Sequence, residues 1–153
     1  MINLEVLSEE KKWSKKIKKK EFFFFSICKS FPKKYRFINK KIFLTLLLSN
    51  NKGIRKLNKK FRNKNMPTDI LSFPSEKKIK LTNNSYLGDI IISYNYMDKP
   101  RNQARDFFKE KVIKTFIHGF LHLLNFNHIK FKDYKKMIKE EKKIYQSVIK
   151  KIY

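Results

Sequence analysis

The three histidines of this 153-residue chain lie in one short apolar segment, between His118 and His128. His118 and His122 are four residues apart, so on a helix they project from the same face. At about 100° of rotation per residue, a set of large apolar residues falls on roughly the opposite face: Ile113, Phe116, Ile117, Phe120, Leu121 and Leu124. The segment therefore predicts a long helix that buries one face and turns two imidazoles away from the main apolar stripe.

Three clustered imidazoles are typical of a metal site. His128 lies six residues beyond His122, after Asn125 and Asn127, which can end a helix and return the third ring toward the first two. Catalytic zinc sites often have three protein ligands and one position for water. Histidines of an ordinary core would be scattered, whereas this chain has none elsewhere. We therefore predict a catalytic centre of one Zn²⁺, with His118, His122 and His128 as ligands and water in the remaining position.

The residues around the histidines disfavour two familiar kinds of zinc site. Gly119 stands where the helical metalloprotease motif has the glutamate that acts as general base. No cysteine lies near the segment, which argues against a structural zinc finger. Water on an open metal site can become a nucleophile because the metal lowers its pKa. The chemistry of such a site does not identify its substrate, so a metallohydrolase that acts on a substrate other than RNA is an alternative.

The positive charge of the chain indicates a polyanionic partner. Its 38 Lys+Arg residues against 13 Asp+Glu residues give a formal net charge of +25, which suits nucleic acid or an anionic membrane surface. A coding bias toward lysine and asparagine accounts for part of this excess, so the charge permits an RNA partner without establishing one. The stretch from Lys15 to Lys20 is either a solvated face or a stripe that contacts phosphate groups.

Cysteine usage and apolar run lengths bear on the compartment. The single cysteine, Cys28, excludes an internal disulfide framework and suits a reducing compartment. The apolar runs at 22–28 and 42–48 are shorter than the roughly 20 residues that span a bilayer. The first residues lack the basic start and cleavage site of a secretory signal. We therefore expect a soluble cytoplasmic protein with no membrane partner, with an organelle matrix as the alternative compartment.

The order of apolar patterns predicts a mixed α+β fold. We expect four strands, at 2–7, 41–49, 69–73 and 86–93, with the last two forming a hairpin-like pair. We expect helices at about 8–30 with Ser8 as cap, after Asn50, from 94 onward, at about 103–124 and at 133–152. This order implies a single domain of residues 1–153, in which helices cover a mixed four-stranded sheet.

A polar segment before the third predicted strand contains Arg62. Cleavage of a phosphodiester needs cationic help for the charge that develops on the phosphate oxygens. Arg62 is a candidate source of that charge. The alternative is an ordinary solvated arginine in a loop.

Three blocks of the sequence resemble the endoribonuclease YbeY (rRNA maturation factor) family. HGFLHLLNFNH at 118–128 is similar to the family pattern H-G-x-L-H-L-x-G-[YF]-D-H. LNKKFR at 57–62 with PTDILSFP at 67–74 resembles a second family motif, and GDIIIS at 88–93 resembles a third. The blocks occur in the family's order and together cover the chain from about Leu57 to His128.

The resemblance implies a single-domain α+β fold with zinc on His118, His122 and His128. It implies a single-strand-specific endoribonuclease that acts in maturation of the 3′ end of small-subunit (16S) rRNA and in ribosome quality control. The implied partners are rRNA and the small ribosomal subunit, with no DNA substrate. By the same resemblance His118 and Arg62 are catalytic, Arg62 stabilises phosphate charge, and Arg62 and Lys64 contact RNA.

The chain departs from the family pattern at three positions. Asn63 and Asn125 stand where the family usually has glycine, and Asn127 stands where it usually has aspartate. Asparagine tolerates left-handed backbone better than most residues, so we expect the turn at Asn125 to survive. The Asn127 amide can orient a neighbour but cannot act as a base. This change favours the alternative of a non-enzymatic, zinc-stabilised rRNA-binding assembly factor. The sequence does not determine whether water or a 2′-hydroxyl is the attacking group, and it does not determine the oligomeric state.

Overall fold

The computed structural model describes residues 1–101 and 103–153. The strands are β1 (Ile2–Ser8), β2 (Ile42–Ser49), β3 (Ile70–Pro74) and β4 (Ser85–Ser93). The helices are α1 (Trp13–Lys16), α2 (Lys20–Lys29), α3 (Lys33–Arg36), α4 (Asn51–Arg62), α5 (Tyr94–Met97), α6 (Arg105–Leu123) and α7 (Phe131–Ile152). Within these described ranges, no helix combines the length and the apolar character needed to cross a lipid bilayer.

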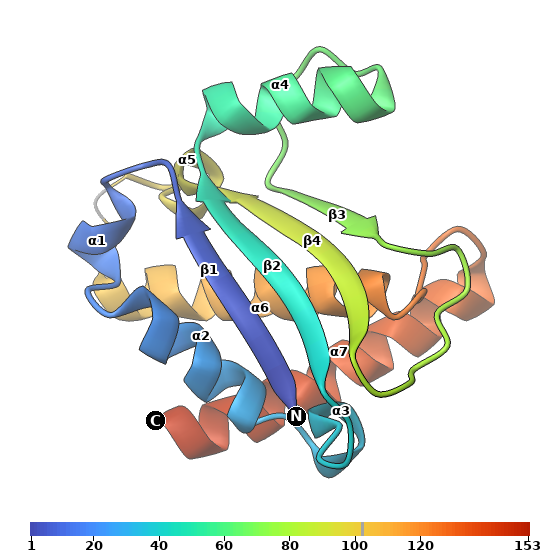
Figure 1. Ribbon diagram of the computed structural model, residues 1–153. Coiled ribbons are helices and arrows are strands. Elements are labelled where there is room, and N and C mark those ends of the chain that lie inside the picture. The colour runs from blue at the N-terminus through green and yellow to red at the C-terminus, as the bar shows by residue number, and fades with distance from the viewer. Residues whose placement is uncertain (102) are drawn as a thin grey trace.

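The four strands form one sheet in the order β1-β2-β4-β3 (Figure 1). β1, β2 and β4 run parallel, whereas β3 runs antiparallel to β4 with Ile70 opposite Ile92. The predicted mixed four-stranded sheet is therefore confirmed, and so is the hairpin-like pair of its last two strands. Because β2 and β4 are parallel neighbours, the hairpin partner β3 is left at an edge of the sheet.

Helices cover the two faces of this sheet unequally (Figure 1). On one face α2, α6 and α7 enclose the main core, in which α6 buries nine of its 19 residues. On the other face α4 forms a second, smaller cluster, where Ile54 packs with Leu71 and Ile91. The α+β fold with helices over a mixed sheet is confirmed. The long helix that carries two histidines is the central element of the main core.

The prediction of one helix over residues 8–30 is wrong. Ser8 is the last residue of β1, and the chain forms two helices, α1 and α2, separated by extended backbone at Ile17 (φ −131°, ψ 98°). Trp13 packs against Phe108 at 5.7 Å between ring centroids, and Phe24 packs against Phe116 at 5.4 Å.

The spacing of these aromatic contacts explains the break. Phe108 and Phe116 are about 12 Å apart along α6, whereas Trp13 and Phe24 would be about 17 Å apart on one continuous helix at roughly 1.5 Å per residue. The bend shortens that spacing, so both side chains are fully buried against α6. Tertiary packing thus overrides a helical pattern that is locally continuous.

Gly119 brings α6 close to the edge strand β3. A β-carbon added at this glycine would lie 2.6 Å from Cδ1 of Ile70 and 3.0 Å from Oγ of Ser72. The missing side chain therefore allows the helix to approach β3 more closely than another residue would. This approach places β3, together with the residues that precede and follow it in the chain, next to the histidine face of α6.

Candidate metal centre

The structure brings the three histidines together. His118 and His122 lie near the end of α6 and are half-buried, while His128 lies in the exposed loop that follows. One nitrogen atom from each ring lies within 4.8 Å of the others. The His118 and His122 rings stand nearly perpendicular, at 4.5 Å between centroids. This spacing allows three imidazoles to act on one small ligand such as a metal ion.

Hydrogen bonds at the far side of two rings set their orientation. Nδ1 of His118 lies 2.9 Å from Oε1 of Glu141, and Nδ1 of His122 lies 2.9 Å from the Phe126 carbonyl oxygen. Both partners are acceptors, so each Nδ1 carries the proton and each Nε2 carries a lone pair. Such partners are typical of histidines that bind metal.

The two lone pairs point at each other. Nε2 of His122 lies 3.0 Å from Nε2 of His118. Two unprotonated nitrogens at this distance repel unless a cation lies between them. Burial lowers the pKa of His122, and the neighbouring His118 lowers it further, so a proton is disfavoured as that cation. The donor set therefore fits a divalent metal ion.

The loop that carries His128 keeps its turn despite the two asparagines. Asn125 adopts left-handed backbone (φ 67°), as expected, and its Oδ1 accepts a hydrogen bond from the Ile79 N–H at 2.9 Å. Oδ1 of Asn127 accepts from the Ile129 N–H at 3.3 Å. Asn127 therefore supports the backbone beside His128, but it supplies no carboxylate there.

An open cleft of about 550 Å³ lies in front of the histidines and is also lined by Arg62, Asp69, Ser72 and Lys77. Nη2 of Arg62 donates to the Ser72 carbonyl oxygen at 3.0 Å, and the guanidinium lies 5.5 Å from the Phe73 ring centroid. These contacts hold a permanent positive charge beside the three rings. The described residues that line the cleft do not include Lys64, which is exposed in the segment that follows α4.

Three further residues of the site were missed by the sequence interpretation. Glu141 belongs to α7 and lies 23 residues beyond His118. The one local sign of a role was its position four residues after the buried Met137, which puts both residues on the same face of an amphipathic helix. Asp69 is the sole acid among the described lining residues, and the sequence predicted it only as the first residue of a strand. Ser72 is buried, and its Oγ has no hydrogen-bond partner among residues 1–101 and 103–153.

The fold and the cleft define a class of small α+β proteins in which three histidines that fit a metal ion lie beside a fixed arginine. A family model described as Endoribonuclease YbeY matches residues 6–149. The chain belongs to the endoribonuclease YbeY family, so both the predicted family and the predicted enzyme class are confirmed.

Similar proteins cover nearly the whole chain. Endoribonuclease YbeY of Pelagibacter ubique (strain HTCC1062) is 62% identical over 152 residues, which are 99% of each chain. Endoribonuclease YbeY of Ehrlichia ruminantium (strain Gardel) is 34% identical over 82% of this chain and 78% of its own. The solution structure of TM1509 from Thermotoga maritima has a TM-score of 0.59 at 25% identity, covering 95% of this chain and 89% of that one.

Proposed function

We propose that this protein is a zinc-dependent, single-strand-specific endoribonuclease that acts in maturation of the 3′ end of small-subunit (16S) rRNA and in ribosome quality control. The observation that carries the metal dependence is the pair of facing Nε2 atoms of His118 and His122, 3.0 Å apart. The nuclease class follows from the family. Both the single-strand preference and the rRNA substrate rest on the resemblance.

The residues of this chain have distinct parts in the proposed cleavage. His118, His122 and His128 hold the ion, which when bound supplies a Lewis acid for the phosphate and lowers the pKa of coordinated water. Arg62 offers the guanidinium donors not used by Ser72 to phosphate oxygens, where negative charge develops.

Two hydrogen-bonding side chains complete the proposed site. Asp69 is the carboxylate that lines the cleft and is our candidate for accepting the proton of the attacking group. The unpartnered Oγ of Ser72 can donate to the phosphate. Both lie on or beside β3, opposite the histidine face of α6.

The partners follow from charge and family together. The net charge of +25 favours binding to RNA backbone, with Arg62 and Lys64 among the contacts. We propose rRNA in the small ribosomal subunit as the substrate and the cytoplasm as the compartment.

The His118→Ala variant tests this proposal. The wild-type protein, purified without a histidine tag, should contain about one zinc per chain by elemental measurement. It should also cleave single-stranded rRNA precursor and leave the duplex form intact. His118→Ala should lose both the metal and the cleavage. Cleavage by the variant at the wild-type rate would reject the proposal. A 2′,3′-cyclic phosphate at the cut end would identify the 2′-hydroxyl as the attacking group, whereas a 5′-phosphate with a 3′-hydroxyl would identify water.

Asn127 favours a second candidate, a non-enzymatic rRNA-binding assembly factor in which zinc only stabilises the loop. Its amide is engaged with the Ile129 N–H and offers no base beside His128. Incubation of the wild-type protein and rRNA precursor with and without a chelator separates the two functions. The assembly factor predicts zinc-dependent folding of the loop and retained RNA binding, with an uncut precursor in both samples.

A further inference from the structure

A second cleft lies at the other end of α4 and α6 from the histidines. It has a volume of about 700 Å³ and is formed by α1, α5 and the first residues of α4 and α6. One carboxylate, Asp98, lines it, together with six cationic side chains: Lys12, Lys15, Lys16, Lys99, Arg101 and Arg105. The cleft therefore concentrates positive charge in a concave surface, where the field on an approaching anion is strongest.

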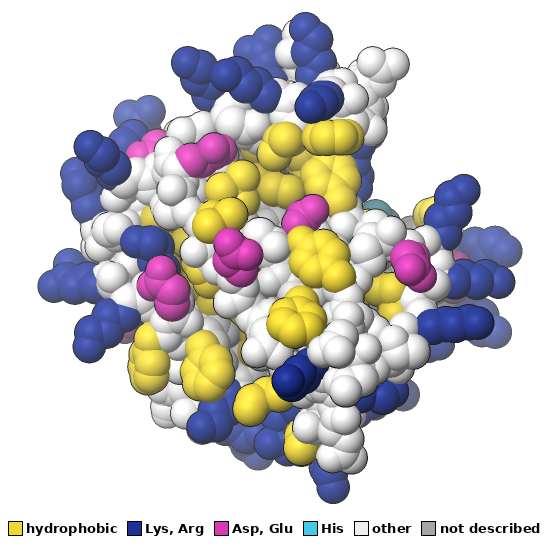
Figure 2. Space-filling view, viewed as in Figure 1, with side chains coloured by type: hydrophobic (Ala, Val, Ile, Leu, Met, Phe, Trp, Pro, Cys, Tyr) yellow, Lys and Arg dark blue, Asp and Glu magenta, His cyan; other side chains and the backbone are white. Residues whose placement is uncertain are grey.

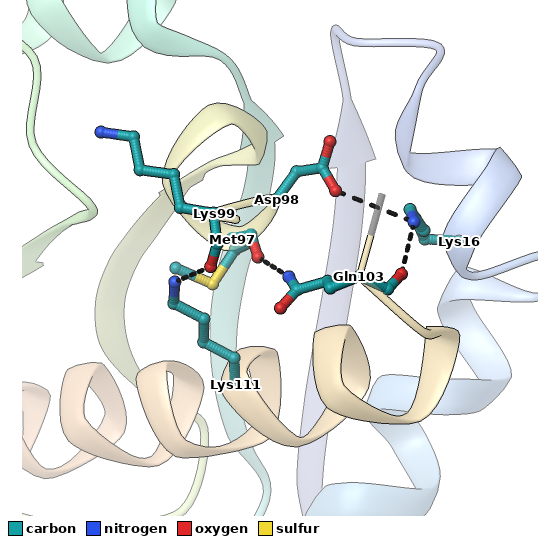
Figure 3. A network of polar contacts seen from close by, with 6 residues as sticks. All are labelled: Lys16, Met97, Asp98, Lys99, Gln103 and Lys111. Atoms are coloured by element: carbon teal, nitrogen blue, oxygen red, sulfur yellow. Dashed lines mark hydrogen bonds and ion pairs between the residues drawn. The ribbon is translucent and has the colours of Figure 1, made fainter. Parts of the chain in front are cut away.

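A network of polar contacts holds the rim of this cleft (Figure 3). Nζ of Lys16 donates to the Gln103 carbonyl oxygen at 3.0 Å and lies 3.7 Å from Oδ1 of Asp98. The Gln103 side chain donates to the Met97 carbonyl oxygen, and Nζ of Lys111 donates to the Lys99 carbonyl oxygen at 3.0 Å. Lys16 thus neutralises the one acid, and the other lining cations remain available to a ligand.

Two helices join this cleft to the histidine cleft. Asn51 of α4 lines the second cleft and Arg62 lines the first, so the clefts are about 17 Å apart at roughly 1.5 Å per residue. Arg105 and His118 of α6 line the same two clefts and give about 20 Å. At roughly 3.4 Å per phosphate of a stacked strand, this span equals about five or six nucleotides.

Basic residues lie along both helices between the clefts. Arg55 follows Asn51 by one turn on α4, and Lys111 precedes His118 by two turns on α6. The open face of the sheet differs, because Figure 2 shows hydrophobic and acidic side chains in its middle and Lys and Arg around its rim and on α4. A polyanion that leaves the histidine cleft therefore meets favourable charge along α4 and α6 and repulsion on the sheet.

We propose that the second cleft, lined by Lys12, Lys15, Lys16, Lys99, Arg101 and Arg105, binds the phosphates of single-stranded RNA that flanks the bond cleaved at the histidines. The inference rests on the proposed function and adds a second binding site for the same strand. The site holds the backbone and reads no base, because its lining is cationic and polar. It raises affinity for substrates long enough to reach both clefts.

A charge-reversed variant tests the second cleft. Lys15→Glu/Arg101→Glu/Arg105→Glu changes three exposed side chains that the structure does not engage in the rim network. The matched control is Lys139→Glu/Lys142→Glu/Lys150→Glu on the exposed side of α7, since both triple variants have a formal net charge of +19 instead of +25. The probe is a labelled oligouridylate of about 12 nucleotides, which is longer than the span between the clefts.

Binding is measured in EDTA, where the probe stays intact, as a function of salt. The cleft variant should bind roughly tenfold more weakly than the control, and its slope of log affinity against log salt should be smaller by about two, for three lost phosphate contacts. Equal affinity and slope in the two variants would overturn the inference. Binding could fall only in the cleft variant while wild-type protein with zinc leaves RNA uncut. That result would reject the proposed cleavage and still support the second cleft as an RNA-binding site.

Substrate length provides a second readout with zinc present. The cleft variant should raise the KM of a long single-stranded substrate roughly tenfold. It should leave the KM of a substrate of about three nucleotides unchanged, because that substrate is too short to reach both clefts. Equal effects on both lengths would show that the charges do not act as a separate site.

Discussion

Oε1 of Glu141 lies 2.9 Å from Nδ1 of His118, so a carboxylate on α7 orients a histidine on α6. Removing such a partner typically weakens metal binding by 10- to 100-fold. We expect Glu141→Ala to weaken zinc affinity by about that factor, and Glu141→Gln to weaken it less because its amide oxygen still accepts a hydrogen bond. Competition with a chromophoric chelator measures the affinity. The control is Glu21→Ala, which removes the same charge from an exposed position on α2. Equal zinc affinity in the wild type and all three variants would contradict the role of Glu141.

Arg62 is expected to act on the cleavage step more than on substrate binding. Arg62 donates to the Ser72 carbonyl, and we propose that its remaining donors bind a phosphate. Lysine at this position keeps the charge but loses the planar fork that both contacts need. Arg62→Lys should therefore lower kcat by about 100- to 1000-fold with a smaller change in KM. Steady-state cleavage of a labelled RNA separates the two constants. Arg36→Lys on α3, which lines neither of the two clefts described above, is the control and should keep wild-type kcat. A rise in KM with unchanged kcat for Arg62→Lys would assign Arg62 to binding only.

Asn63 ends α4 in left-handed backbone, with φ 58° and ψ 28°. A β-branched residue is strained there, so Asn63→Val should lower the free energy of unfolding by about 1–2 kcal/mol. Glycine has no such strain, and Asn63→Gly should stay within about 0.5 kcal/mol of wild type. Urea denaturation of the three proteins measures the difference. A stable Asn63→Val protein would show that the helix end does not need this conformation.

Gly88 lies in β4 with φ 138°, beside the shift in register between β2 and β4. A β-carbon there would lie 2.1 Å from the Phe73 carbonyl oxygen, which belongs to the backbone of β3 and cannot rotate away. Gly88→Ala should therefore lower the free energy of unfolding by about 3 kcal/mol. Gly119→Ala should cost less, because the nearest atom there is the end of the Ile70 side chain. Thermal and urea unfolding of both variants would test this order, which the reverse result would refute.

Glu140 and Tyr35 should make part of the stability depend on pH. The hydrogen bond from the Tyr35 hydroxyl lowers the pKa of Glu140 below its ordinary value of 4.5. The unfolded chain therefore binds more protons than the folded chain in this range, and stability is present above pH 4.5 and lost as the pH falls through the folded pKa. Tyr35→Phe keeps the ring against Phe120 but removes the donor.

The difference in unfolding free energy between wild type and Tyr35→Phe should be largest near about pH 7 and shrink below about pH 4. Urea denaturation at several pH values measures this difference. The same difference at every pH would show that the hydroxyl does not influence the titration of Glu140.

Local patterns in the sequence were sufficient for the four strands, for most of the longer helices and for part of the site. The 3.6-residue period of α6 placed His118 and His122 opposite the apolar stripe, and Asn125 matched the left-handed turn that the structure shows. These features depend on neighbours along the chain, so their periodicity and backbone preference are visible in one sequence.

Features that join distant segments were decided only by the tertiary structure. The order β1-β2-β4-β3, the break at Ile17 and the contact between Glu141 and His118 depend on packing between residues far apart in the chain. The sequence by itself determined that three histidines could meet around one ion. The fold decided which carboxylate orients His118, which arginine lies beside the histidines and where the second basic cleft lies, because those distances arise only when helices pack on the sheet.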